Sequence, residues 1–215
     1  MKRGMILTLI AIAFWACTSA PRPRLTPPPL PAMEAPEGAD RDFTQGWYDL
    51  SLGHVAEAQR AFVASTAPEA LRQAGFGFVS RAQGNQRNAR AHFEKALVLA
   101  PETWIAAWGL SMLHDQGGDS EAAVAVLELS ARHLPENRVI GDRLAELRDR
   151  EARRWQQQAE KYRRDGSLPE ALEALEKALR YAPGRIDLLR DAARLQAAAG
   201  DQTDAIPHLE AIVHS

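Results

Sequence analysis

The sequence predicts an all-α fold, a solenoid of about five helix-turn-helix repeats. One observation is a recurring pattern of a small residue, a large apolar residue, a second small residue and a proline, with a glycine five residues before it. The complete copies are Ala89, Phe93, Ala96 and Pro101, then Ala123, Leu127, Ser130 and Pro135, then Ala171, Leu175, Ala178 and Pro183. A second observation is the spacing, since Gly84 to Gly118 and Gly166 to Gly200 are each 34 residues apart. That is the period of a two-helix repeat.

The first element is an N-terminal leader, residues 1–16. Lys2 and Arg3 precede an apolar run that ends at Ala16 and is shorter than the roughly 20 residues of a membrane-spanning helix. The run ends in Phe14-Trp15-Ala16-Cys17, which resembles a bacterial lipobox, so we expect Cys17 to be lipidated and to become the new N-terminus. In a Gram-negative bacterium Thr18 would then indicate the outer membrane. The alternative is cleavage after Ala20 and secretion of a soluble protein. Cys17 is the only cysteine, so the chain can form no internal disulfide.

The second element is a proline-rich tether, residues 17–40. It carries seven prolines and little to bury: Pro21, Pro23, Pro27, Pro28, Pro29, Pro31 and Pro36. Such a stretch favours the extended polyproline II conformation, which rises about 3 Å per residue. We expect a semi-rigid spacer between lipid and domain. The alternative is a docking peptide for a module that reads polyproline.

The third element is the helical domain, residues 41–215. Each copy of the pattern is expected to form a helix, a turn at the glycine and a second helix that stops at the proline. The small residues let the paired helices approach, and the phenylalanine or leucine fills the groove between them. We place the repeats near residues 41–69, 70–103, 104–135, 136–185 and 186–215. The last copy is truncated after Gly200, Ala205, Leu209 and Ile212.

The repeats resemble the tetratricopeptide repeat, or TPR. The copy most similar to its pattern is Trp155, Ala159, Tyr162, Gly166, Ala171, Leu175, Ala178 and Pro183. The resemblance implies a right-handed superhelical solenoid whose concave groove, lined mainly by the first helix of each repeat, binds a protein or peptide partner.

One interval departs from the period. Gly118 and Gly166 are 48 residues apart, which is 14 more than the repeat length. The extra residues lie within 136–158, a proline-free stretch, so we expect them to lengthen the first helix of the fourth repeat by about four turns. This is either a tolerated insertion or a contact arm for a partner.

The candidate binding groove has two halves. Counting back from the turn glycines, the groove positions are apolar in the first three repeats and basic in the last two. The candidates are Phe43, Trp47, Phe78, Trp108 and Met112, followed by Arg163, Arg164, Arg190 and Arg194. Aromatic residues rimmed by arginine are typical of protein interfaces. The alternative is that the aromatics pack between helices and the arginines are simply solvated.

Residue patterns for catalysis and cofactor binding are not found. The six histidines are scattered over several repeats without metal-ligand spacing, and no phosphate-binding loop or nucleophile-elbow motif occurs. We therefore expect no enzyme activity, no metal and no cofactor. The formal net charge of −2 argues against nucleic-acid binding, which needs a basic excess.

Together these observations predict a lipid-anchored periplasmic scaffold that mediates protein interactions in envelope complex assembly. Two alternatives remain, a non-catalytic recruitment factor for a cell-wall enzyme and a secreted soluble TPR binding protein. The last repeat has no helix behind it to cover Leu209, Ile212 and Val213, so homodimerisation through that end is a further possibility.

Overall fold

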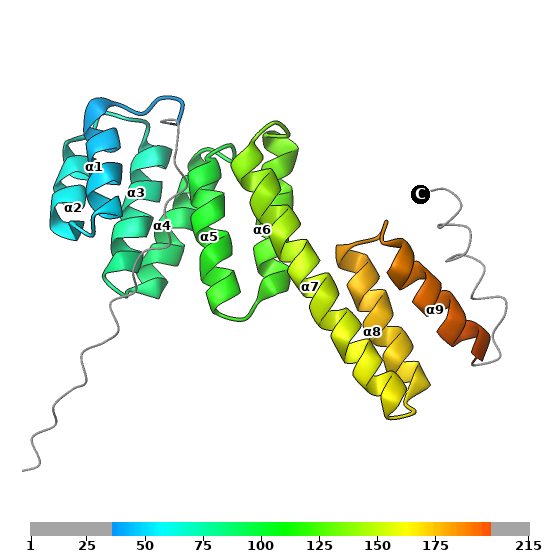
Figure 1. Cartoon of the computed structure of the whole chain (residues 1–215). Helices are drawn as coiled ribbons and strands as arrows, with labels where there is room; N and C mark the ends of the chain where they lie inside the picture. The colour runs from blue at the N-terminus through cyan, green and yellow to red at the C-terminus, as the bar shows by residue number, and fades with distance from the viewer. Residues whose placement is uncertain (1–35, 199–215) are drawn as a thin grey trace, which may run out of the picture.

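The computed structural model describes residues 36–198, which form nine α-helices and no strand (Figure 1). The helices are α1 (Arg41–Ser51), α2 (Val55–Ala64), α3 (Glu69–Ala82), α4 (Gln86–Leu99), α5 (Trp104–Gln116), α6 (Ser120–His133), α7 (Arg138–Arg164), α8 (Leu168–Tyr181) and α9 (Ile186–Ala198). Consecutive helices pair as hairpins, and the first helices of neighbouring hairpins contact one another, α1 with α3, α3 with α5 and α5 with α7. The prediction of an all-α solenoid is confirmed.

The recurring glycine ends the first helix of each complete hairpin. Gly84 has a φ of +79°, and Gly53, Gly118 and Gly166 adopt nearly the same value. This left-handed conformation is strained for residues that carry a Cβ, and it lets the chain reverse directly after the helix. At Gly84 the backbone N–H donates to the carbonyl of Arg81 over 2.9 Å, which closes the helix end. The 34 residues between Gly84 and Gly118 therefore separate the end of α3 from the end of α5.

Glycines inside the first helices create room for aromatic rings. Phe93 of α4 is fully buried, and its ring lies against Gly77 of α3 and Gly109 of α5. A Cβ added at Gly109 would lie only 2.5 Å from Cζ of Phe93. Gly75 meets the ring of Phe62 in the same way. Phe62 and Phe93 thus pack into spaces that only a missing side chain provides.

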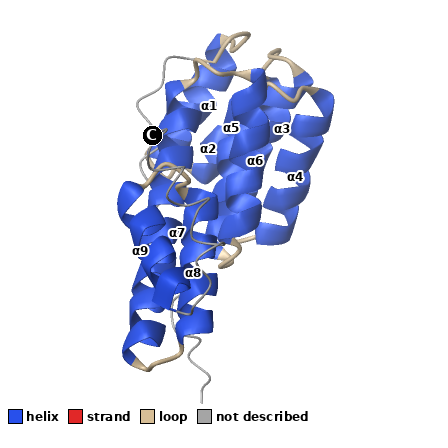
Figure 2. Cartoon of the chain, turned by 90° about the vertical axis from the view of Figure 1, so that its right-hand side faces the viewer, coloured by secondary structure: helices blue, strands red, loops and turns tan. Residues whose placement is uncertain are grey.

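Helix α7 belongs to two hydrophobic cores. Its 27 residues compare with 10 to 14 in the other helices. Ile140, Leu144 and Leu147 complete a first core that begins in α1, whereas Ala152 and Ala159 belong to a second core with α8 and α9. In Figure 2 helices α8 and α9 accordingly extend away from the block formed by α1 to α6. The extra residues of this interval therefore separate two packed units.

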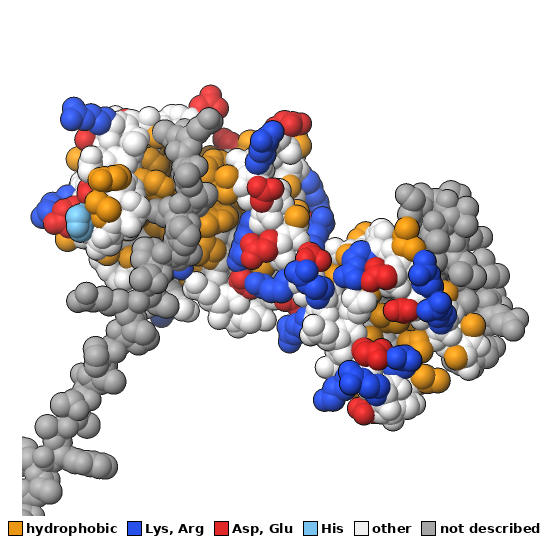
Figure 3. Space-filling view, in the orientation of Figure 1, with side chains coloured by type: hydrophobic (Ala, Val, Ile, Leu, Met, Phe, Trp, Pro, Cys, Tyr) orange, Lys and Arg blue, Asp and Glu red, His pale blue; other side chains and the backbone are white. Residues whose placement is uncertain are grey.

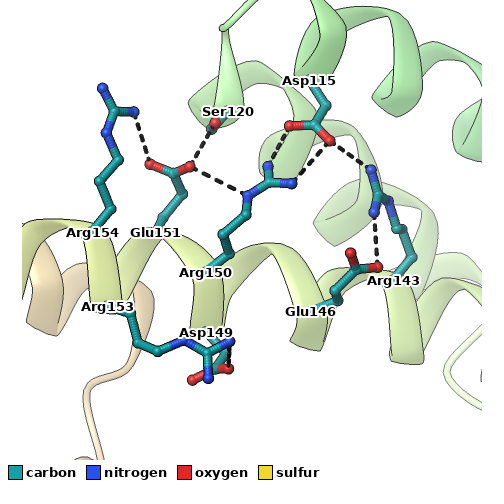
Figure 4. A network of polar contacts seen from close by, with 9 residues as sticks. All are labelled: Asp115, Ser120, Arg143, Glu146, Asp149, Arg150, Glu151, Arg153 and Arg154. Atoms are coloured by element: carbon teal, nitrogen blue, oxygen red, sulfur yellow. Dashed lines mark hydrogen bonds and ion pairs between the residues drawn. The ribbon is translucent and has the colours of Figure 1, made fainter.

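A polar network fixes α7 where one core ends and the next begins (Figure 4). Glu151 is buried, accepts a hydrogen bond of 2.8 Å from the Ser120 hydroxyl of α6, and lies 3.3 Å from a guanidinium nitrogen of Arg154. Arg143 and Arg150 both pair with Asp115 at the end of α5, the first at 2.7 Å. The hydrogen bond to Asp115 raises the pKa of Arg150 further above its ordinary value. The direction in which α7 leaves the first core is thus set by charged contacts.

The chain segment before α1 is fastened to the fold by Asp40. Its carboxylate caps α1 by accepting from the Phe43 N–H over 2.7 Å, and it also accepts 2.8 Å hydrogen bonds from the hydroxyls of Ser65 and Thr66. These bonds, that from Phe43 above all, hold the pKa of the Asp40 carboxyl well below its usual range. The start of the domain is therefore tied to the α2–α3 connection.

Several predictions concern residues outside the described range. They are the leader 1–16, the lipidated Cys17, the tether as far as residue 35, and the last repeat beyond residue 198 with Leu209, Ile212 and Val213. Within the described range, no helix is both long enough and apolar enough to cross a membrane.

Replacing Gly109 with alanine is expected to lower the free energy of unfolding, because the new Cβ must displace the Phe93 ring in a filled core. Such overpacking costs about 1–3 kcal/mol, and the better helix propensity of alanine offsets at most about 1 kcal/mol. Urea unfolding followed by circular dichroism measures the change. Gly141 of α7 is the matched control, since a Cβ there meets nothing within 4 Å. Gly141→Ala should stabilise the protein, and equal stability of the two variants would contradict the packing of Phe93.

Replacing Glu151 with alanine is expected to lower the free energy of unfolding by about 1–3 kcal/mol, because the buried Ser120 hydroxyl loses its acceptor. Glu151→Gln retains an oxygen for that bond and should cost less. Glu146, whose carboxylate pairs with Arg143 at 2.8 Å on the surface, is the control, with an expected loss below about 1 kcal/mol on alanine substitution. Thermal unfolding distinguishes the three variants, and an unchanged melting temperature for Glu151→Ala would refute its role at the junction.

Candidate functional site

The predicted aromatic residues form a continuous row across three first helices. Trp47 of α1 contacts Phe78 of α3 edge to face, with ring centroids 4.9 Å apart, and Phe78 contacts Trp108 of α5 at 5.8 Å. Phe43 lies beside Trp47, with ring centroids 6.3 Å apart, and against Phe62 of α2 at 5.2 Å. Figure 3 shows hydrophobic side chains gathered over α1, α3 and α5. We call Trp47, Phe78 and Trp108 the aromatic row.

Most of these side chains are buried. Phe43 is 1% exposed, Phe78 3%, Trp108 8% and Met112 6%, and only Trp47 is partly exposed. Phe43 and Phe78 also pack against the second helices through Phe62 and Phe93. The structure thus brings the apolar candidates together, and all but Trp47 contribute to the first core. Their role in binding remains a prediction.

The basic candidates lie around a pocket of about 600 Å³ between α7 and α9. Its floor is apolar and its rim is charged. The lining residues are Arg153, Gln156, Gln157, Ala159, Glu160, Arg163, Arg164, Leu175, Asp191, Arg194 and Leu195. We call this the arginine pocket. Of the predicted residues, Arg163, Arg164 and Arg194 line it, whereas Arg190 is exposed on α9 but is not among the lining residues.

Acidic residues that the sequence analysis did not single out share this rim. Glu160 pairs with Arg163 at 2.7 Å, and Asp191 lies 3.7 Å from Arg194. Both pairs have i,i+3 spacing on one helix, which is the sequence signal that could have revealed them. The hydrogen bond from Arg163 lowers the pKa of Glu160, so this carboxylate is ionised at neutral pH. Four arginines face two carboxylates on the rim, and Arg153 also pairs with Asp149 at 2.6 Å, so the rim keeps a small positive excess.

A second hollow, of about 440 Å³, lies where the aromatic row meets α7. Trp108 and Met112 form its apolar side, and Asp115, Asp142, Arg143 and Glu146 are its charged residues. Its lining carries three carboxylates and one arginine, and Arg150, which also pairs with Asp115, leaves an excess of one negative charge. We call it the acidic hollow. The inner helices therefore carry an acidic and a basic pocket at the two ends of α7, a contrast that the analysis of groove positions did not predict.

These groups are suited to ion pairing and apolar contact. The arginines are charged at any physiological pH, and the carboxylates beside them are paired. Across residues 36–198, no group of three or more histidine, cysteine, aspartate or glutamate side chains is placed to hold a metal ion. What the arrangement offers is an electrostatically patterned surface for another molecule.

Solved structures that are similar to this chain share less than a fifth of its residues in the aligned part. Among solved structures, MamA AMB-1 is similar over 79% of this chain and 94% of its own, with 18% identity and a TM-score of 0.38. MamA 41-end from Desulfovibrio magneticus RS-1 is similar over 80% of this chain and 92% of its own, with 19% identity and a TM-score of 0.37. No curated protein matches the sequence.

A family comparison is more decisive. The family model described as tetratricopeptide repeat matches residues 80–137 and residues 157–215, which together make up more than half of the chain. The first match covers the end of α3 and all of α4, α5 and α6, and the second covers the latter part of α7, with α8 and α9. The match is interrupted at residues 138–156, in the part of α7 that passes from the first core to the second. With the repeat period, the glycine-ended hairpins and this match in agreement, the chain belongs to the tetratricopeptide repeat family.

Proposed function

We propose that this protein is a lipid-anchored scaffold of a bacterial cell envelope that holds a protein partner and performs no chemistry of its own. Tetratricopeptide repeats are protein-interaction modules, so the solenoid supports a general role as a scaffold for protein binding. The arginine pocket is the observation that carries the specific proposal. Its apolar floor, formed by Ala159, Leu175 and Leu195, is surrounded by exposed arginines.

The chemistry of the arginine pocket favours an acidic segment of the partner. Side chains of Arg153, Arg164 and Arg194 are 61%, 71% and 72% exposed, so their guanidinium groups can reach a ligand without a rearrangement of the core. Arginine offers a planar fork of donors that matches a carboxylate with two hydrogen bonds. The leucine floor would accept one or two apolar side chains between those carboxylates.

The proposed location rests on the N-terminal sequence. Lys2, Arg3 and the apolar run place a cysteine at the expected end of a signal peptide, and Thr18 follows it. A lipid on Cys17 would hold the domain at a membrane surface through the proline-rich tether. We propose the periplasmic face of the outer membrane if the bacterium is Gram-negative, with a role in the assembly of an envelope complex.

The double substitution Arg163→Glu/Arg194→Glu is expected to weaken binding of an acidic peptide at least tenfold, which corresponds to about 1.4 kcal/mol. The probe is a fluorescein-labelled peptide of alternating glutamate and leucine, followed by fluorescence anisotropy. Binding to the unmodified chain should also weaken as the ionic strength rises, because these charges are exposed.

The matched control for this experiment is Arg87→Glu/Arg90→Glu, which changes the same number of charges on the exposed surface of α4. It should leave the affinity within about twofold of the unmodified protein, since charges separated by more than a Debye length are largely screened. Equal losses in the two double variants would mean that net charge, rather than the arginine pocket, governs binding.

Replacing Cys17 with alanine is expected to move the protein from the membrane fraction to the soluble or precursor fraction, because no thiol remains to be acylated. Labelling cells with an alkyne analogue of palmitate should mark the unmodified chain and leave Cys17→Ala unmarked. Labelling of both proteins, or of neither, would refute the anchor while leaving the proposed peptide binding open to its own test.

A further inference from the structure

We propose that Glu160 fills one of two carboxylate positions in the arginine pocket, so that the pocket takes a partner segment with one carboxylate beside a large apolar side chain. A strongly acidic segment gains little over such a partner. The inference rests on the proposed function, because it narrows the chemistry of the segment that the arginine pocket binds. The residues concerned are Arg163, Arg164 and Arg194, which line the pocket between α7 and α9.

The first support is a repeat position at which the last two repeats lack a large apolar side chain. Six residues before its turn glycine, each of the first three repeats carries a large apolar residue, and the last two carry charged residues. These residues are Trp47, Phe78, Met112, Glu160 and Arg194. The helices α1, α3, α5 and α7 contact one another in turn, whereas the arginine pocket of about 600 Å³ lies between α7 and α9. We therefore expect the partner to supply the apolar side chain that this position lacks.

The second support is that the pocket is accessible. Side chains of Arg163, Arg164 and Arg194 are 57%, 71% and 72% exposed. Beneath them Leu175 and Leu195 line the pocket and also belong to the second core. Figure 3 shows basic, acidic and hydrophobic side chains together over α7 and α9. A volume of this size is within the range of small-ligand sites, so a leucine-sized side chain can enter without a rearrangement of the core.

The third support is the forked contact between Glu160 and Arg163. Nε and Nη2 of Arg163 donate to the two carboxylate oxygens of Glu160 over 2.9 Å and 2.7 Å. Arginine binds a carboxylate of another molecule with the same pair of parallel hydrogen bonds. Because the two residues are three positions apart on one helix, Glu160 forms this contact without the loss of translational freedom that binding imposes on a partner. In the free protein, Glu160 thus stands where a partner carboxylate would bind.

The fourth support is that Arg164 and Arg194 are not engaged in this way. Asp191 lies 3.7 Å from Nη1 of Arg194, which is beyond hydrogen-bond distance. Nε of Arg164 donates to the backbone carbonyl of Glu160 over 3.4 Å and lies 3.8 Å from its carboxylate. Within residues 36–198, the terminal nitrogens of these two guanidinium groups form no hydrogen bond. They therefore offer a second position, which is open to a carboxylate of the partner.

The charge balance of the rim agrees with a single partner carboxylate. Of the four arginines, Arg153 is paired with Asp149, and the charges of two others are offset by Glu160 and Asp191. One positive charge remains, which one carboxylate neutralises. A second carboxylate has to displace Glu160 from Arg163, and it replaces one forked contact by another of the same kind. The affinity gained from the second carboxylate is therefore small.

The test compares two fluorescein-labelled peptides with C-terminal amides, using the full chain and fluorescence anisotropy. One peptide, Gly-Gln-Leu-Glu-Gly, carries a single carboxylate, and the other, Gly-Glu-Leu-Glu-Gly, carries two. In an extended segment the two glutamates lie on one side and the leucine on the other, which suits a charged rim and an apolar floor. The unmodified chain is expected to bind the second peptide less than threefold more tightly than the first.

Replacing Glu160 with glutamine is expected to raise this affinity ratio at least threefold, because Arg163 becomes free for the second carboxylate. Glu176→Gln is the matched control, since it removes the same charge from an exposed position of α8 that does not line the pocket. The control should retain the ratio of the unmodified chain. A ratio of threefold or more in the unmodified chain, or a smaller rise in Glu160→Gln, would overturn the proposal. An equal rise in Glu176→Gln would assign the effect to net charge and would also overturn it.

Exchanging the leucine of the one-carboxylate peptide for serine measures the apolar contribution. The affinity for the unmodified chain is expected to fall at least fivefold, because the serine peptide buries no apolar side chain against Leu175 and Leu195. A smaller fall would mean that charge alone governs binding, and the proposed pairing of one carboxylate with one apolar side chain would be wrong.

The outcomes also separate this inference from the proposed function. Binding of both short peptides with a ratio that Glu160→Gln leaves unchanged would reject the role of Glu160 and retain the arginine pocket. Binding of the longer alternating peptide alone would likewise reject this inference only. If no peptide binds, or if Arg163→Glu/Arg194→Glu has no effect on any of them, the proposed function and the role of Glu160 are rejected together.

Discussion

Helix α7 has to satisfy two hydrophobic cores at once, and the rest of the architecture follows from that constraint. A single helical hairpin cannot bury its own apolar side, so each repeat depends on its neighbour. In α7 the first half supplies Leu144 and Leu147 to the core of the preceding hairpins, and the second half supplies Ala159 to the core of α8 and α9. Because one continuous helix contributes to both, the two units keep a defined relation, and Tyr181 of α8 packs against both cores.

The contacts that α7 makes with α5 and α6 at the transition between the two cores are largely polar. Glu151 is buried beside Ser120, and Arg150 and Arg143 both pair with Asp115. Such contacts have a preferred geometry, whereas apolar packing alone would allow α7 to slide or rotate. The same geometry determines where the arginine pocket lies, since one of its walls is the second half of α7.

The two halves of the inner surface differ in how they are desolvated. Packing aromatic rings against one another lowers the free energy of the folded state. Phe78 accordingly packs against Trp47, Phe93 and Trp108 and belongs to the core. Arginines keep their guanidinium groups in water and form short-range pairs with nearby acids, as Arg163 does with Glu160. The first half therefore contributes to the core, whereas the arginines of the second half remain exposed to solvent.

Much of the fold could be predicted because the repeat pattern is a pattern of local requirements. Gly84 and Gly166 mark turns that need a positive φ, and Phe93 and Leu175 mark the grooves between paired helices. The candidate site was less predictable. Counting groove positions located Arg163 and Arg194, but it did not reveal their acidic partners, the separation of Arg190 from the arginine pocket, or the acidic hollow at Asp142 and Glu146.

By itself, then, the sequence determined the helical class, the repeat period, the turn positions and the residue types that face inward. These depend on backbone conformation and on contacts between residues close in the chain. Only the tertiary structure decided which aromatic side chains are buried, how α7 divides its faces between two cores, and which charges meet. Those outcomes depend on side chains far apart in the chain, such as Ser120 with Glu151, 31 positions apart, and Asp115 with Arg150, 35 positions apart. The relative rotation of stacked helices places them together.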